Sequence, residues 1–113
     1  MIIAIDFDAT LMDPKNVQPG YRMGPPTPGA IAATKRLRAE GHTIIVFTAR
    51  NVQDPRVHKA VMDWCEHFGI PASGASNIKS PSYDVIIDNR AIHFDSWPHV
   101  MMNLTDIQNN AKM

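Results

Sequence analysis

The sequence predicts a doubly wound α/β domain with a mainly parallel sheet and helices on both of its faces. Three short apolar runs, at residues 2–5, 43–47 and 85–87, are rich in β-branched side chains. Each run is continuous rather than alternating, which is typical of strands covered on both faces in a parallel sheet. Helical patterns separate and follow the runs, and this alternation favours right-handed crossovers between parallel strands.

The first helix is expected between Thr27 and Gly41. Thr27 can cap its first turn, Pro28 suits the first helical position, and Gly41 can end it. Ile31, Thr34 and Leu37 share one face of this helix, which is expected to face the core.

A second helix is expected to open at Asp54 and Pro55 and to end at Gly69. Its buried face is expected to consist of residues at helical spacing: Val57, Ala60, Val61, Trp64 and Phe68. Residues 70–73 are expected to add a further short strand.

A third helix is expected to run from about Pro98. Its apolar face is formed by residues at helical spacing: Val100, Leu104, Ile107 and Ala111. Both tryptophans, Trp64 and Trp97, are expected to pack in the protein.

The 113 residues fit one domain, residues 1–113, without a cap domain. Acidic and basic residues balance, so the total charge indicates neither nucleic acid nor an anionic membrane as a partner. The single cysteine, Cys65, excludes an internal disulfide framework and shows no sign of activation. No apolar run approaches the roughly 20 residues that cross a bilayer, and nothing resembles a signal peptide. We therefore expect a cytoplasmic protein with no membrane partner.

The segment 11–29 breaks the alternation of strands and helices. It contains five of the nine prolines of the chain. A loop of this length inside a compact domain is usually functional or disordered. We expect that it can act as a partial lid over a site.

Polar residues follow each predicted strand at its carboxyl end, where open α/β sheets bind their ligands. Asp6, Asp8 and Thr10 follow the first strand, and Thr48 and Arg50 follow the second. A second group belongs to the third strand: Asp88 and Asn89 follow it, and Lys79 lies in the loop that enters it. These residues are therefore expected to share one edge of the sheet.

Asp6 and Asp8 are two residues apart on an extended chain and point the same way. Carboxylates that share a pocket repel unless a cation or a proton lies between them. With Asp88 the formal charge is −3, and Mg²⁺ together with Lys79 would bring it to zero. Oxygen ligands without cysteine or histidine favour Mg²⁺ over zinc. One carboxylate can then act as a nucleophile and another as a general acid.

The order of these motifs resembles the haloacid dehalogenase (HAD) superfamily. The run DFDATL at residues 6–11 resembles its first motif, usually Asp-x-Asp-Gly-Thr, and FTAR at residues 47–50 resembles the second. Lys79 looks like the third motif, and IDNRA at residues 87–91 looks like the fourth. The runs PTPGAI at 26–31 and GHTII at 41–45 are similar to the first helix and second strand of small capless members. The resemblance covers nearly the whole chain.

The resemblance implies a Mg²⁺-dependent phosphomonoester hydrolase. Asp6 would be the nucleophile that forms an aspartyl-phosphate, and it would also bind the metal. Asp8 would act as general acid and base, with its backbone carbonyl on the metal. Thr48 and Lys79 would hold the phosphoryl oxygens, and Asp88 would be the remaining carboxylate ligand.

Two further residues near these motifs are candidates for substrate binding. Thr10 lies in the first motif and Arg50 in the second. For Arg50 a structural salt bridge is an equal alternative. The substrate class stays open between a phosphorylated small metabolite and a phosphorylated nucleic-acid end. Because no cap domain is present, a bulky substrate or a second subunit of a homo-oligomer is expected to cover the site.

Three residues test the resemblance. Ala9 replaces the usual glycine of the first motif, which raises the question of a left-handed backbone there. Asn89 replaces the second acid of the fourth motif and bears on metal affinity. Asp84 precedes Asp88 by four residues, a span of roughly 13 Å along a strand, so it is expected at the opposite edge of the sheet.

Two alternative functions remain. A catalytically weakened binding or regulatory module would account for Ala9 and Asn89. A phospho-accepting receiver domain also uses an acidic pair, a threonine and a lysine, but its acceptor aspartate ends a later strand. No aspartate ends the second predicted strand here, which argues against a receiver.

Overall fold

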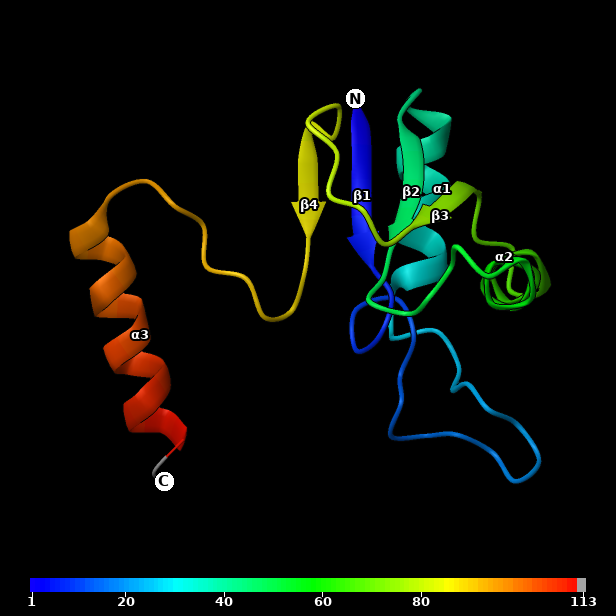
Figure 1. Cartoon of the computed structure of the whole chain (residues 1–113), viewed down its shortest axis with the longest axis horizontal. Coiled ribbons are helices and arrows are strands. Elements are labelled where there is room, and N and C mark those ends of the chain that lie inside the picture. Colours follow the sequence, from blue (N-terminus) through cyan, green and yellow to red (C-terminus); the bar gives the residue numbers. More distant parts are fainter. Residues whose placement is uncertain (112–113) are drawn as a thin grey trace.

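The fold is known from a computed structural model, in which residues 1–111 are described. The elements follow in the order β1 (Ile2–Asp6), α1 (Ala30–Ala39), β2 (Thr43–Phe47), α2 (Pro55–His67), β3 (Ala72–Ser76), β4 (Val85–Ile87) and α3 (Trp97–Ala111). The strands form one parallel sheet in the order β3-β2-β1-β4 (Figure 1). The predicted α/β fold class with a parallel sheet is confirmed.

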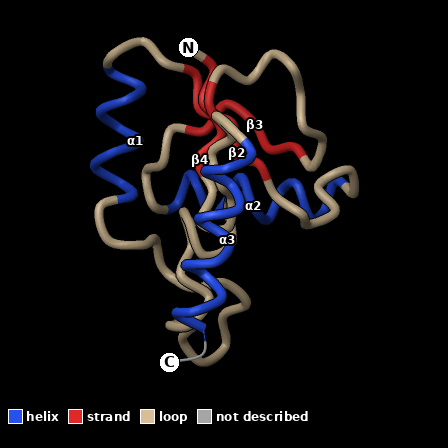
Figure 2. The backbone as a smooth tube through the Cα atoms, turned by 90° about the vertical axis from the view of Figure 1, so that its left-hand side faces the viewer, coloured by secondary structure: helices blue, strands red, loops and turns tan. Residues whose placement is uncertain are grey.

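The core lies against the two central strands. Ile3 is paired with Ile44 and Ile5 with Val46, and all four side chains are buried in one apolar cluster. Burying side chains of this size stabilises the fold by about 1.5–3 kcal/mol each. Trp64 of α2 joins the same cluster, and α1 lies alongside the sheet (Figure 2). Trp64 therefore packs as expected.

β4 is less covered than its apolar sequence predicts. It pairs only with β1 in the described sheet and forms its edge. Val85 and Ile87 remain 40% and 41% exposed. A continuous apolar run indicates burial on both faces, which holds for β1 and fails for β4 because no described helix or strand contacts its outer side.

The two covering helices begin differently from each other. α2 begins as predicted, since the Asp54 carboxylate accepts a hydrogen bond from the Arg56 backbone N–H at 2.9 Å and Pro55 occupies the first turn. The predicted start of α1 is wrong. The Thr27 hydroxyl donates to the Thr10 carbonyl at 2.6 Å instead of capping a helix. Gly29, with φ of 85°, then leads the chain into α1.

The additional strand lies slightly later than residues 70–73. Ile70 follows α2 and closes its last turn, because the Ile70 backbone N–H donates to the Cys65 carbonyl at 2.8 Å. Gly69 has φ of 72°, a left-handed backbone conformation that glycine readily adopts just after the end of a right-handed helix. The chain becomes extended only afterwards, and β3 therefore begins at Ala72.

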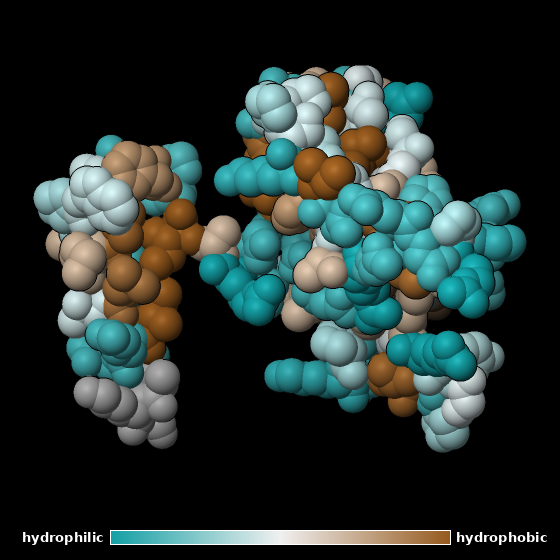
Figure 3. Space-filling model, in the orientation of Figure 1, coloured by the Kyte–Doolittle hydropathy of each residue, from teal (hydrophilic) through white to brown (hydrophobic). Residues whose placement is uncertain are grey.

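α3 starts close to the predicted position but stands apart from the rest of the protein. It contacts none of the other helices and strands in the described chain (Figures 1 and 3). Trp97 is 68% exposed, and among the aromatic side chains of residues 1–111 it meets only Phe94, edge to face, with ring centroids 5.3 Å apart. The expectation that Trp97 packs into the protein is therefore wrong. Among the helices of residues 1–111, none combines the length and apolar character needed to cross a membrane.

Candidate active site

The predicted site residues come together at the carboxyl edge of the sheet. Asp6 is the last residue of the central strand β1, and its strand partner is Phe47 of β2. On the other side Ile5 pairs with Ile87, so Asp88 follows β4 next to Asp6. The edge lies at the lower ends of the strand arrows in Figure 1. Parallel pairing thus brings together segments more than 40 residues apart.

Asp6 lies in an unfavourable environment for its charge. Partial burial and the neighbouring charge of Asp88 raise the pKa of the Asp6 carboxyl, and the charge of Asp8 adds to this. The Thr10 hydroxyl donates to Asp6 Oδ2 at 3.4 Å and partly opposes the increase in pKa. A site with this uncompensated negative charge attracts a cation.

Asp8 is held by Arg50. Arg50 Nη2 donates to Asp8 Oδ1 at 2.8 Å, and Arg50 Nε donates to Asp8 Oδ2 at 3.1 Å. This bidentate contact raises the pKa of the Arg50 guanidinium. The guanidinium also lies over the Phe7 ring, 5.4 Å from its centroid. Of the two roles left open for Arg50, a salt bridge is what the described chain contains.

Thr48 is buried directly after β2. Its hydroxyl oxygen accepts a hydrogen bond from the Arg50 backbone N–H at 3.1 Å. A hydroxyl that accepts in this way keeps its own hydrogen available for donation. Thr48 therefore retains the donor that the predicted contact with a phosphoryl oxygen requires.

Asp88 and Lys79 differ in how firmly they are placed. Asp88 Oδ1 accepts from the Arg90 backbone N–H at 2.8 Å, which fixes the carboxylate in a turn. Lys79 is exposed in the connection between β3 and β4, and within residues 1–111 its ammonium forms no hydrogen bond or ion pair. The phosphate-binding role of Lys79 stays a prediction.

The two departures from the usual motifs have structural consequences. Ala9 adopts φ of 65°, the left-handed conformation that glycine usually provides. Asn89 Oδ1 accepts a hydrogen bond from the Thr10 hydroxyl at 3.3 Å. Thr10 thus lies between Asn89 and Asp6 and has one hydroxyl hydrogen for two acceptors. The substrate-binding role of Thr10 stays a prediction.

Several contacts at this edge were not foreseen from the sequence. Phe7 lies under Arg50 and also packs against Trp64, with ring centroids 5.0 Å apart. The sequence marks Asn89 only as a replaced metal ligand, whereas its side-chain oxygen accepts a hydrogen bond from the Thr10 hydroxyl. Both residues lie inside the motifs, which is the only sequence signal that marks them.

The donors suited to a metal are carboxylate and carbonyl oxygens. Among residues 1–111, no three histidine, cysteine, aspartate or glutamate side chains gather closely enough to hold a metal ion. The side chain of Asp8 is directed to Arg50, so the side-chain donors at the edge are those of Asp6 and Asp88. Asp84 is absent from this set, as expected. Its carboxylate accepts from the Ile2 backbone N–H at 2.7 Å, at the opposite end of the sheet.

The base of the 11–29 loop is tied to the body. The Trp64 indole N–H of α2 donates to the Gly24 carbonyl at 2.9 Å, and within the loop itself the Asp13 N–H donates to the Pro25 carbonyl at 2.8 Å. A groove of about 600 Å³ separates the outer loop from α2, with Tyr21 and Trp64 in its walls. The loop is thus anchored beside α2, and its role as a partial lid stays a prediction.

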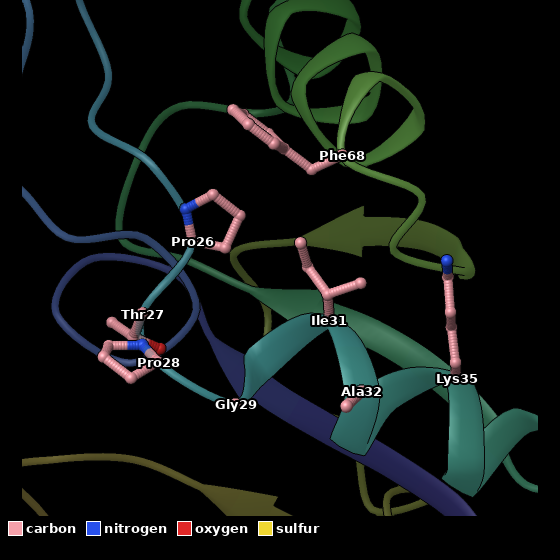
Figure 4. A pocket seen from close by; sticks show the side chains of 8 residues that line it. All are labelled: Pro26, Thr27, Pro28, Gly29, Ile31, Ala32, Lys35 and Phe68. Carbon is pink, nitrogen blue, oxygen red and sulfur yellow. The ribbon is translucent and has the colours of Figure 1, made fainter.

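A second groove, of about 630 Å³, lies at the start of α1, where Ile31 and Phe68 line it and Lys35 marks one end (Figure 4). Neither groove includes Asp6, Asp8 or Asp88. The carboxylate edge is therefore not part of the wall of either groove. Cys65 is buried, and burial raises the pKa of its thiol to about 11, which disfavours the reactive thiolate at neutral pH.

Comparisons with known proteins bear on the fold and do not bear on the function. No protein-family model matches the chain, and no curated protein matches it. The chain is similar to a solved structure of a conserved protein from Bacteroides thetaiotaomicron, with a TM-score of 0.59 and 23% identity. The match covers 94% of this chain and 90% of that protein. At this level of identity the similarity establishes a shared α/β fold alone.

Proposed function

We propose that this protein is a phosphomonoester hydrolase of the HAD type in which the Asp6 carboxylate attacks phosphorus. The observation that carries the proposal is the position of Asp6: it ends the central strand, beside Asp88, and its pKa is raised by burial and by that neighbour. Perturbed carboxylates at the carboxyl edge of a parallel sheet are typical of catalytic sites.

The side chains at the edge suit a two-step reaction. In the first step an Asp6 oxygen bonds to phosphorus, the ester P–O bond breaks, and the leaving oxygen takes a proton from Asp8. In the second step water attacks the aspartyl-phosphate, Asp8 takes a proton from this water, and Asp6 is released with inorganic phosphate. Thr48, whose hydroxyl hydrogen is available, would donate to a phosphoryl oxygen.

Arg50 controls when Asp8 can take part. Both Asp8 oxygens accept hydrogen bonds from Arg50 in the free protein. Before Asp8 can donate to a leaving oxygen, its carboxylate has to turn one oxygen away from the guanidinium and take up a proton from solvent on it. Arg50 is therefore a positioning residue for Asp8. The Arg50 N–H group that loses its Asp8 acceptor can then donate to a phosphoryl oxygen.

Magnesium is the cofactor that fits these donors. Asp6 and Asp88 offer hard carboxylate oxygens and repel one another, and the backbone carbonyl of Asp8 can complete the set. When bound, Mg²⁺ would neutralise charge on the carboxylates and on the transferring phosphoryl group. The substrate class remains a phosphorylated small metabolite or a phosphorylated nucleic-acid end, because the carboxylate edge carries no feature that selects between them.

Turnover of an aryl phosphate, measured with Mg²⁺ and with excess chelator, tests this proposal. We expect metal-dependent release of phosphate, which Asp6→Asn abolishes. Asp63→Asn is the matched control, since Asp63 is an exposed residue of α2 that pairs with Lys59. Asp8→Asn should accumulate a phosphoryl group on Asp6, which intact-mass measurement detects, because hydrolysis then lacks its base.

The results also separate the alternatives. Phosphate binding without turnover would indicate the weakened binding module. Turnover that survives Asp6→Asn or excess chelator would exclude the proposed chemistry.

A further inference from the structure

α3 carries an apolar stripe that has no partner in its own chain. Four side chains on one side of the helix form this stripe: Trp97, Met101, Leu104 and Ile107. Met101 is 57% exposed and Ile107 is 55% exposed. An isolated helix of 15 residues is marginal in water, so its stability has to come from packing of its apolar face.

A second unpartnered apolar surface lies on the edge strand. Val85 and Ile87 are two residues apart on β4, so their exposed side chains lie on the same face, and we call this surface the β4 patch. Its outer side is not covered by any described helix or strand. Exposed apolar edge strands promote association, and proteins usually cover them. The α3 stripe is directed toward the body, across a gap that separates α3 from it (Figure 3).

α3 does not cover its own sheet, and its direction differs from that of α1. α1 runs back against the strand direction, as a covering helix does, whereas α3 runs in the same direction as β4 (Figure 1). The start of α3 is held by local contacts: the Phe94 and Trp97 rings meet edge to face, and the Asp95 carboxylate pairs with His99 Nδ1 at 2.8 Å. Residues 88–96 can span about 30 Å, which allows α3 to reach a neighbouring molecule.

The charges of α3 narrow the choice of partner. Between Trp97 and Ala111 the helix contains no lysine or arginine, and its one acidic residue is Asp106. Helices that lie on membranes usually carry basic residues on their polar face, and nucleic acids require them as well. A neutral apolar stripe instead fits a neutral apolar protein surface, which the β4 patch supplies.

We infer that two copies of this chain form a twofold dimer in which α3 of each copy packs on the β4 patch of the other. In such an arrangement each copy offers one stripe and one patch, so both unpartnered surfaces of both molecules become covered. The contact is isologous and closes on itself, which excludes open-ended assembly. The inference does not depend on the proposed catalytic function.

Light scattering on the eluting protein tests the dimer. We expect twice the chain mass of 12.6 kDa. Leu104→Asp places a carboxylate in each of the two symmetric contacts and should raise the dimer dissociation constant at least about 100-fold. Asn103→Asp adds the same charge beside the stripe and is the matched control. Leu104 is exposed and lies outside the apolar core that packs on β1 and β2, so neither substitution should unfold that core.

A mixed sample of isotope-labelled and unlabelled protein identifies the contact. The dimer predicts intermolecular NMR contacts from the methyl groups of Leu104 and Ile107 to those of Val85 and Ile87. A monomer at the concentration used for NMR would overturn the inference. So would a dimer that Leu104→Asp leaves intact, or one without these intermolecular contacts.

Discussion

Replacing Arg50 by lysine is expected to impair the proposed hydrolysis selectively, according to the leaving group of the substrate. Arg50 fixes Asp8 through two parallel hydrogen bonds, of 2.8 and 3.1 Å. Lysine keeps the positive charge but cannot form a planar bidentate contact. The variant therefore retains the electrostatic attraction to Asp8 and loses the orientation of its carboxyl.

The expected effect follows from the geometry of this pair. A hydrogen bond to a charged group contributes about 1.5–3 kcal/mol when it is shielded from water. The Arg50 and Asp8 side chains are 34% and 43% exposed, so solvent lowers the loss to about 1 kcal/mol. A loss of this size corresponds to roughly a 5-fold decrease in rate.

The ratio of kcat/KM values for an alkyl and an aryl phosphate measures this effect. Departure of an alkoxide depends on a proton from Asp8, whereas an aryl oxide leaves with little help. We expect Arg50→Lys to lower the alkyl-to-aryl ratio roughly 5-fold. Arg56→Lys is the control, because Arg56 pairs with Asp54 at the exposed start of α2. An equal loss with both substrates would refute the reasoning, since it would mean that Arg50 acts on the phosphate alone.

Four further predictions concern the same edge and its loop. Asp6→Asn should raise the melting temperature at pH 7 without metal but not at pH 3. The pKa of Asp6 is raised in the folded state, so its ionisation destabilises the native protein as pH increases above the pKa of the unfolded state. An equal gain at both pH values would contradict this cause. Ala9→Gly should increase the free energy of unfolding by about 0.5–1 kcal/mol in denaturant titrations, because it relieves a φ of 65°; a decrease would mean that the left-handed backbone is not strained. Gly24→Ala should lower the free energy of unfolding by about 3 kcal/mol, because the added Cβ would overlap a backbone carbonyl of the same loop. The control Gly74→Ala should lower it far less, because the added Cβ would point into open space. Asn89→Asp should lower the Mg²⁺ concentration needed for half-maximal activity, because it adds negative charge at the edge; an unchanged midpoint would show that this side chain does not face the ion.

The sequence was sufficient to predict which segments form the sheet and which residues lie at its carboxyl edge. Strands β1, β2 and β4 could be read from continuous apolar runs, and α2 from its Asp54 cap. These features are local, and the alternation of strands and helices then fixes a parallel sheet. The gathering of Asp6 and Asp88 follows from that topology alone.

Other features could not be predicted because residues distant in the sequence compete for the same groups. Thr27 is a residue type that often caps helices, but its hydroxyl donates a hydrogen bond to the Thr10 carbonyl instead. Arg50 could form a salt bridge or contact a substrate, and only the fold brings it to Asp8, 42 residues earlier. The left-handed backbone of Ala9 is likewise imposed by the turn around it, since alanine has no local preference for it.

The sequence by itself thus determined the order of the elements, the parallel α/β fold and the chemical character of one sheet edge. These properties are encoded in the spacing of apolar residues and in caps, which act over a few residues. Only the tertiary structure decided which apolar surfaces are covered. β4 and α3 have the apolar patterns of buried elements, yet they remain exposed in the single chain. A residue is buried only when another surface packs against it, and the periodicity of apolar residues in a sequence does not identify that surface.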